Sequence, residues 1–187
     1  ARVRPGDTVL SGGAAGNVGS CAVQLAVEAG ARVIATASER DLDWCRKLGA
    51  SVVLDYHSPD LAEAVRDAAP DGVSLFWNTS GEHDFDLAVS LLAEGGTIIV
   101  TAGFNARAAL PVGPMYLRGA RIHGFVISRA GVEELAEAAK AMNRLLARDA
   151  LRVRIAATLP LDETAEAHRM IEGNAPRPAP GRIIVLP

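Results

Sequence analysis

The sequence is poor in cysteine, in aromatic side chains and in positive charge. Of 187 residues only 2 are cysteines, and Phe, Trp and Tyr together make up 4%. Two cysteines that lie far apart in the sequence without C-x-x-C spacing are few for the disulfide framework of a secreted domain, so we expect a reducing, cytoplasmic location. The 22 Asp and Glu residues outnumber the 19 Lys and Arg residues, which argues against nucleic acid as a partner. No apolar run approaches the roughly 20 residues that span a bilayer, so we expect no membrane partner.

Short β-branched runs alternate with helical patterns along most of the chain. This alternation predicts a parallel sheet whose strands are joined by crossover helices. Six strands are expected, at residues 7–11, 32–36, 51–55, 73–77, 97–101 and 120–126. Helices are expected at 18–29, 38–48, from Pro59 onward, 85–92 and 132–147. The pattern indicates an α/β protein with a doubly wound six-stranded sheet, the Rossmann fold, which binds ligands at its switch point.

Residues 151–187 do not fit this domain. They predict a strand at 153–158, a helix at 162–172 and a strand at 182–186, with a proline-rich loop at 174–180. Two apolar strands outside the main sheet need a partner sheet, and the chain opens at Ala1. We therefore expect a dinucleotide-binding domain over residues 1–150, a C-terminal strand–helix–strand appendage over 151–187, and a missing N-terminal portion. A compact appendage that is complete in itself is the alternative.

The clearest motif is the turn Ala14-Ala15-Gly16-Asn17-Val18-Gly19, between the first strand and the first helix. A pyrophosphate needs backbone N–H groups at close range and a helix N-terminus. Gly16 would let the backbone approach the phosphates, and Gly19 would let the helix pack tightly on the strand. Ala14 stands at the first glycine of G-x-G-x-x-G, so the strict motif is not met. The strand before the turn and the helix after it still favour dinucleotide binding over a merely structural turn.

The end of the second strand bears on the choice between NAD and NADP. An acidic residue there would hold the ribose hydroxyls and repel a 2′-phosphate. The sequence instead has Ser38-Glu39-Arg40, in which a hydroxyl and a guanidinium can bind phosphate. The alternative makes Ser38, with Asp41 three residues on, a helix start and Arg40 a solvated charge, and Glu39 is compatible with NAD. The charges favour NADP(H).

Several stretches resemble the medium-chain dehydrogenase/reductases, in the zinc-independent quinone oxidoreductase and enoyl reductase branch. The likeness lies in residues 5–10, 13–20, 22–26, 48–50, 55–56 and 95–97, and in the tail at 161–169 and 181–186. In this family a GroES-like catalytic domain precedes the cofactor domain, and the chain's tail returns to complete it. The resemblance implies that this chain holds the cofactor domain and the returning tail.

The resemblance also implies an NADPH-dependent reductase that transfers hydride to a quinone or an α,β-unsaturated carbonyl compound, a small-molecule substrate. It implies a homodimer through the edge of the sixth strand. The implied site has Ser38, Arg40 and Tyr56 at the 2′-phosphate, Asn78 and Ser80 beside the adenine ribose, and Ala102, Gly103, Phe125 and Val126 along the nicotinamide. For Phe125 and Val126 the alternative is an ordinary core strand.

The sequence offers no metal site and no catalytic pair. His57, His83, His123 and His168 are isolated, and no Cys/His pair has ligand spacing. The catalytic residues stay unknown. Two classes of function remain open: the cofactor half of a reductase, active with a catalytic domain in cis or in trans, and a nucleotide-sensing or protein-interaction module that keeps the fold without catalysis.

Overall fold

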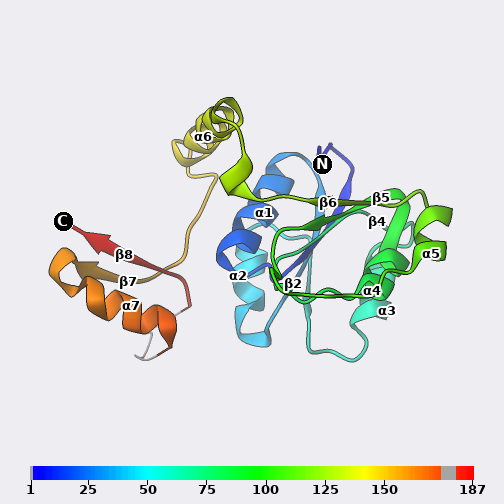
Figure 1. The fold of residues 1–187 in the computed structure, drawn as a ribbon, viewed down its shortest axis with the longest axis horizontal. Helices are drawn as coiled ribbons and strands as arrows, with labels where there is room; N and C mark the ends of the chain where they lie inside the picture. Colours follow the sequence, from blue (N-terminus) through cyan, green and yellow to red (C-terminus); the bar gives the residue numbers. More distant parts are fainter. Residues whose placement is uncertain (1, 174–179) are drawn as a thin grey trace. The chain divides into compact units, whose positions relative to one another are not determined.

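The computed structural model describes residues 2–173 and 180–187. The chain divides into two compact units, Ala1–Leu151 and Arg152–Pro187, and each is described by itself (Figure 1). In the described residues, no helix has both the length and the apolar character needed to cross a membrane.

The larger unit contains a six-stranded sheet in which every neighbouring pair of strands is parallel. Its order is β3-β2-β1-β4-β5-β6, which reverses between β1 and β4 and leaves β6 at an edge. The strands are β1 (Thr8–Gly12), β2 (Arg32–Ala37), β3 (Val52–Asp55), β4 (Val73–Asn78), β5 (Leu92–Val100) and β6 (Arg121–Gly124). The predicted doubly wound Rossmann fold is confirmed.

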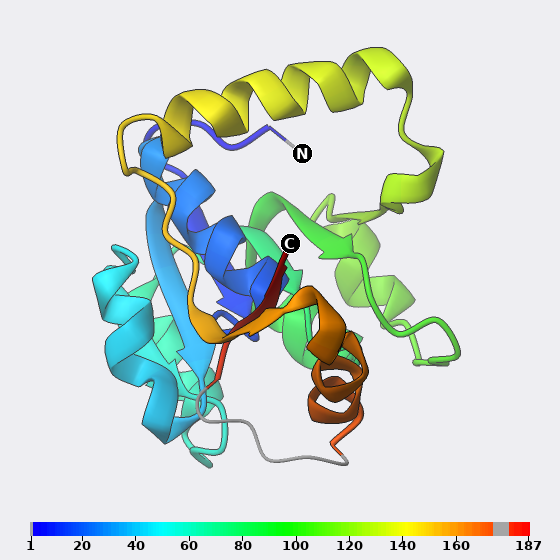
Figure 2. The same cartoon turned by 90° about the vertical axis from the view of Figure 1, so that its left-hand side faces the viewer.

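Helices cover both faces of this sheet. The helices are α1 (Asn17–Glu28), α2 (Leu42–Lys47), α3 (Leu61–Ala68), α4 (Phe85–Leu91), α5 (Val112–Leu117) and α6 (Val132–Leu146), with short 3-10 turns η1 (Glu39–Asp41) and η2 (Ile127–Arg129). Figure 1 shows α1 and α2 on one side of the sheet, and α3, α4 and α5 on the other. Figure 2 shows α6 at the outside of the unit. All residues of α6 are described, and of these Leu145 alone is buried.

The strands bury side chains on both faces, as parallel strands between two helical layers do. Successive residues of β1, Val9 and Leu10, belong to different core clusters. In β2, Val33 and Ile34 divide in the same way. This two-sided burial explains why the strands read as continuous apolar runs in the sequence.

Three local predictions need correction. Helix α5 was not expected, because its segment carries Pro111, Gly113 and Pro114; proline is tolerated in the first helical turn, where no intrahelical partner needs its N–H. Helix α3 begins at Leu61 rather than Pro59, since a turn closed by the hydrogen bond from Leu61 N to Ser58 O comes first.

The third correction concerns the sixth strand. It ends at Gly124, so Phe125 and Val126 leave the strand and are 57% and 51% exposed. The alternative that made these two residues an ordinary core strand is wrong.

The smaller unit has the predicted order of strand, helix and strand. It contains β7 (Ile155–Pro160), a 3-10 turn η3 (Leu161–Glu163), α7 (Thr164–Glu172) and β8 (Arg182–Leu186). The strands β7 and β8 pair in parallel as a separate two-stranded sheet. Most of the predicted proline-rich loop, residues 174–179, lies outside the described residues.

Candidate functional site

The glycine-rich turn joins the end of β1 to the start of α1. Gly13 has a φ of +66°, and its carbonyl accepts a hydrogen bond from Gly16 N at 3.0 Å. The N–H of Ala14 donates to Thr36 O of β2 at 2.9 Å, and this bond fixes the turn to the sheet. Ala14 is fully buried. Alanine serves here because the position needs a tight fit rather than a left-handed backbone.

The residues after Ala14 present free backbone donors. Within the described part of the chain, the N–H groups of Ala15, Asn17 and Val18 form no hydrogen bond. The first turn of α1 carries no acidic residue, so the positive end of the helix dipole is not neutralised. Unpaired amides at such a helix start form an anion site, and the pyrophosphate of a dinucleotide fits this chemistry.

Two glycines of this region have no room for a side chain. A Cβ at Gly19 would lie 2.2 Å from Gly13 O, and one at Gly12 would lie 2.8 Å from Asn78 Oδ1. The first contact brings α1 directly against the turn, and the second brings β1 against the end of β4. Since the strand order reverses between β1 and β4, the glycine-rich turn lies at the switch point where doubly wound sheets bind ligands.

The residues expected at the 2′-phosphate come together at the ends of β2 and β3. Ala37 pairs with Asp55, and Tyr56 N donates to Ala37 O at 3.2 Å. This pairing places Ser38 and Tyr56 at adjacent strand ends. Tyr56 is half exposed, so its ring is available to a ligand.

Sequence reasoning missed the part that Asp41 has in this group. The Ser38 hydroxyl donates to Asp41 Oδ2 at 2.9 Å, and Arg40 Nε lies 3.5 Å from the same oxygen. Asp41 is buried, whereas the Arg40 side chain is 78% exposed. Ion pairs with an exposed partner contribute about 0–1 kcal/mol, so Arg40 can exchange this carboxylate for a phosphate at little cost. The Ser38-x-x-Asp41 spacing was visible in the sequence but was interpreted as a helix start.

Asn78 and Ser80 line a cavity of about 490 Å³ together with Tyr56. The Asn78 side chain is engaged on both sides: Nδ2 donates to Glu82 O at 2.6 Å, and Oδ1 accepts from Ser80 N at 3.0 Å. The structure therefore unites these three predicted residues and gives Asn78 a role in shaping the loop after β4.

His83 was treated as isolated in the sequence, but it connects two loops of the site. Its Nε2 lies 3.0 Å from Ala102 O, and its ring stacks on Phe85 with centroids 5.7 Å apart. Gly81 and Gly103 approach closely beside it, since a Cβ at Gly103 would lie 2.5 Å from Gly81 O. The loops after β4 and β5 are thus held against each other.

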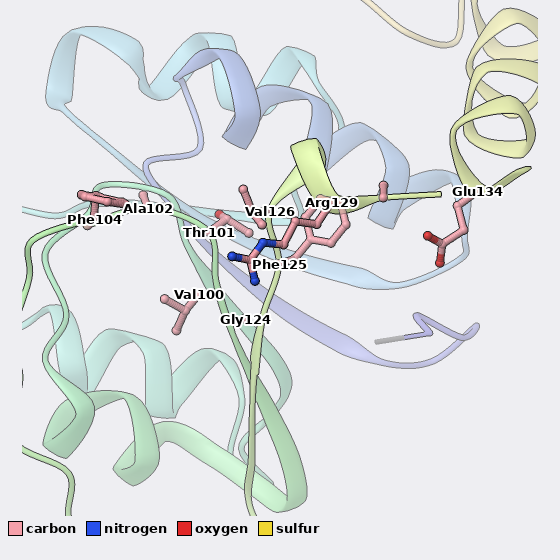
Figure 3. Close-up of a pocket in the computed structure, with 11 residues that line it drawn as sticks. Val100, Thr101, Ala102, Phe104, Gly124, Phe125, Val126, Arg129 and Glu134 are labelled. Carbon is pink, nitrogen blue, oxygen red and sulfur yellow. The ribbon is translucent and has the colours of Figure 1, made fainter. Parts of the chain in front are cut away.

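A larger cavity, of about 720 Å³, lies at the carboxyl ends of β5 and β6. All four residues expected along the nicotinamide line it: Ala102, Gly103, Phe125 and Val126. Figure 3 shows Ala102, Phe125 and Val126 among the lining side chains. Arg129 and Glu134 also line it and were missed. The sequence predicts a strand up to residue 126 and a helix from 132, and no pattern in the residues between them indicates a site.

The described residues contain no group of three or more His, Cys, Asp or Glu side chains that could hold a metal ion.

Comparison with known proteins agrees with this arrangement. Residues 17–144 match the family described as zinc-binding dehydrogenase. The chain is 32% identical to prostaglandin reductase 1 of Bos taurus over 136 residues, which cover 68% of this chain and 41% of that protein. It is 28% identical to the NADPH-dependent curcumin reductase of Escherichia coli over 165 residues, covering 81% of this chain and 48% of that protein.

A solved structure of a 2-haloacrylate reductase superposes with a TM-score of 0.87 at 28% identity, covering all of this chain and 59% of that one. The chain thus spans about half the length of the curated relatives that it matches. The family match, which covers more than half of the chain, and the shared sheet lead to one assignment. This chain belongs to the zinc-binding dehydrogenase family, in the quinone and enoyl reductase-like branch of the medium-chain dehydrogenase/reductases.

Proposed function

We propose that this chain is the NADPH-binding part of an oxidoreductase that reduces a quinone or an α,β-unsaturated carbonyl compound. The observation that carries the proposal is the series of sites along one edge of the sheet: free amides after β1, a hydroxyl and a guanidinium after β2, and an apolar cavity after β5 and β6. The three similar proteins support it, because all are named as reductases and one as NADPH-dependent.

The chain's own residues would hold the cofactor in three places. The amides of Ala15, Asn17 and Val18 would bind the pyrophosphate, and Ser38 and Arg40 would bind the 2′-phosphate beside Tyr56. The cavity at the ends of β5 and β6 would place apolar side chains along the nicotinamide. When bound, NADPH supplies a hydride to an electron-poor carbon of the acceptor.

We further propose that the groups polarising the acceptor lie outside this chain, in a catalytic part present in cis or in trans. The support is that the similar proteins are about twice as long as the region matched. A homodimer through the edge of β6 and a cytoplasmic location stay predictions.

Replacing Arg40 with glutamine tests the cofactor assignment. We expect the unchanged chain to bind NADPH more tightly than NADH, as measured by nicotinamide fluorescence. Hydrogen bonds to charged groups contribute about 1.5–3 kcal/mol, so Arg40→Gln should weaken NADPH binding about tenfold or more and leave NADH within about twofold.

Arg46→Gln is the matched control, because Arg46 is also exposed and pairs with a neighbouring carboxylate, that of Asp43. It should leave both affinities unchanged. Equal weakening of NADPH and NADH by Arg40→Gln would contradict the 2′-phosphate role. Tight NADPH binding without turnover of any quinone or enone by the gene's whole product would instead favour the nucleotide-sensing module.

A further inference from the structure

Among the described residues, the cavity at the ends of β5 and β6 is lined by one arginine, Arg129, that forms no ion pair. Its walls are mainly apolar, with Val100, Phe104, Phe125 and Val126 among them. Of the residues that line it, only Arg129 and Glu134 are charged. Figure 3 shows the Arg129 guanidinium pointing back from η2 toward the ends of the two strands. A guanidinium without an ion-pair partner beside apolar walls is suited to a ligand with an apolar body and a negative group.

Arg129 is not neutralised by its surroundings. In the described residues its side chain takes part in no ion pair and no hydrogen bond. Glu134, the acidic residue that lines the cavity, forms no ion pair with Arg129; its Oε2 accepts a hydrogen bond from Gly131 N at 3.0 Å at the start of α6. The guanidinium is therefore available to an anion that enters the cavity.

Local hydrogen bonds fix the backbone that carries Arg129. Its N–H donates to Val126 O at 3.2 Å, and the next residue, Ala130, donates to Ile127 O at 3.0 Å. These bonds form the 3-10 turn η2 directly after the two residues expected along the nicotinamide. The guanidinium is thus carried on a short, ordered segment rather than on a long loop.

The phosphates of the cofactor do not account for this charge. The strands β1, β4, β5 and β6 are consecutive in the sheet, so the end of β6 lies three strand spacings, about 14 Å, from the phosphate turn. The expected 2′-phosphate group at the end of β2 is one spacing farther. Arg129 therefore faces the nicotinamide end of the site, where the acceptor must bind.

Resting on the proposed function, we propose that Arg129 selects acceptors that carry a carboxylate, and that the substrate class includes α,β-unsaturated carboxylates. A guanidinium binds a carboxylate through two parallel hydrogen bonds. The acceptor's double bond gains a hydride from NADPH at the β-carbon and a proton from water at the α-carbon. The products are the saturated carboxylate and NADP⁺, so the two electrons lost by the cofactor are those gained by the acceptor.

The test uses the whole product of the gene and a pair of substrates that differ in charge, acrylate and acrylamide. Arg129→Gln should raise the KM for acrylate about tenfold or more and leave the KM for acrylamide and the affinity for NADPH within about twofold. Arg129→Lys should restore part of the acrylate effect, since it keeps the charge but loses the two-pronged geometry. Arg144→Gln, on the exposed side of α6, is the control and should change nothing.

A second readout does not need turnover. Calorimetric titration of the NADPH complex with propionate, an unreactive carboxylate, should give binding that Arg129→Gln abolishes. Equal effects on acrylate and acrylamide, or propionate binding that the variant keeps, would overturn the proposal. Absence of propionate binding with intact NADPH binding would also overturn it, whereas loss of NADPH binding in the unchanged protein would refute the proposed function itself.

Discussion

Replacing Gly19 with alanine is expected to lower the free energy of unfolding by about 3 kcal/mol and to abolish binding of NADPH. The added Cβ would lie 2.2 Å from the carbonyl oxygen of Gly13 and 2.8 Å from Ala14 Cα. Both contacts are to backbone atoms, which cannot rotate away as the end of a side chain can. The start of α1 would have to move off the turn, and the free amides would no longer converge on one anion. Thermal unfolding and nicotinamide fluorescence measure the two effects.

Gly16→Ala is the matched control within the same turn. Gly16 is exposed, and a Cβ there would meet only Gly13 O, at 3.2 Å. Loss of a glycine N-cap costs about 1 kcal/mol or less, so this variant should stay folded. Its affinity for NADPH should still fall, because the methyl group stands where the phosphates would approach. If Gly19→Ala proved as stable as the unchanged chain, the close packing of α1 on the turn would be wrong.

Replacing Gly103 with alanine should have the second largest effect. Gly103 has a φ of +83°, and a Cβ would lie 2.5 Å from Gly81 O and 3.0 Å from His83 Nε2. A left-handed backbone costs roughly 1–2 kcal/mol for a residue with a Cβ, and the clash adds to this. We expect about 2–3 kcal/mol of lost stability and a loss of the fluorescence enhancement that a sheltered nicotinamide gives.

Gly95→Ala separates the cost of the left-handed backbone from the cost of the steric clash. Gly95 also has a positive φ, of +69°, but nothing lies within 4 Å of its Cβ position. Its replacement should cost only the backbone strain, about 1 kcal/mol, and leave cofactor binding unchanged. Equal effects of the two variants on stability and on binding would show that the approach of the loops after β4 and β5 does not shape the site.

The fold could be predicted from the sequence because its strands are buried on both faces. Such strands appear as short apolar runs between helical patterns, and the turn at residues 14–19 fixes where the first strand meets the first helix. Helix α5 has no counterpart among the predicted elements, and its six residues follow and include prolines, which weaken the helical pattern. Its formation depends on tertiary packing, since α5 contacts α4 and Met115 packs on the core.

The site was predicted where backbone geometry determines it and missed where side chains meet across the fold. Ser38 and Tyr56 end neighbouring strands, so their proximity follows from the strand order. The contact of His83 with Ala102 joins residues 19 positions apart, and no local pattern signals it. Arg129 was missed because the predicted strand continued through Val126, so the turn that carries Arg129 into the cavity was not foreseen.

The most direct test of the account is a titration of the ¹⁵N-labelled chain with NADPH, followed by amide chemical shifts. We predict that the largest shifts fall on Ala15, Asn17 and Val18 and on Gly103 and Phe125. The cavity of about 760 Å³ at the other end of the sheet, lined by Arg66, Gly72 and Arg118 among others, should stay silent. Shifts confined to that second cavity, or no shifts at all at saturating NADPH, would contradict the claim that this chain holds the nucleotide at the carboxyl ends of its strands.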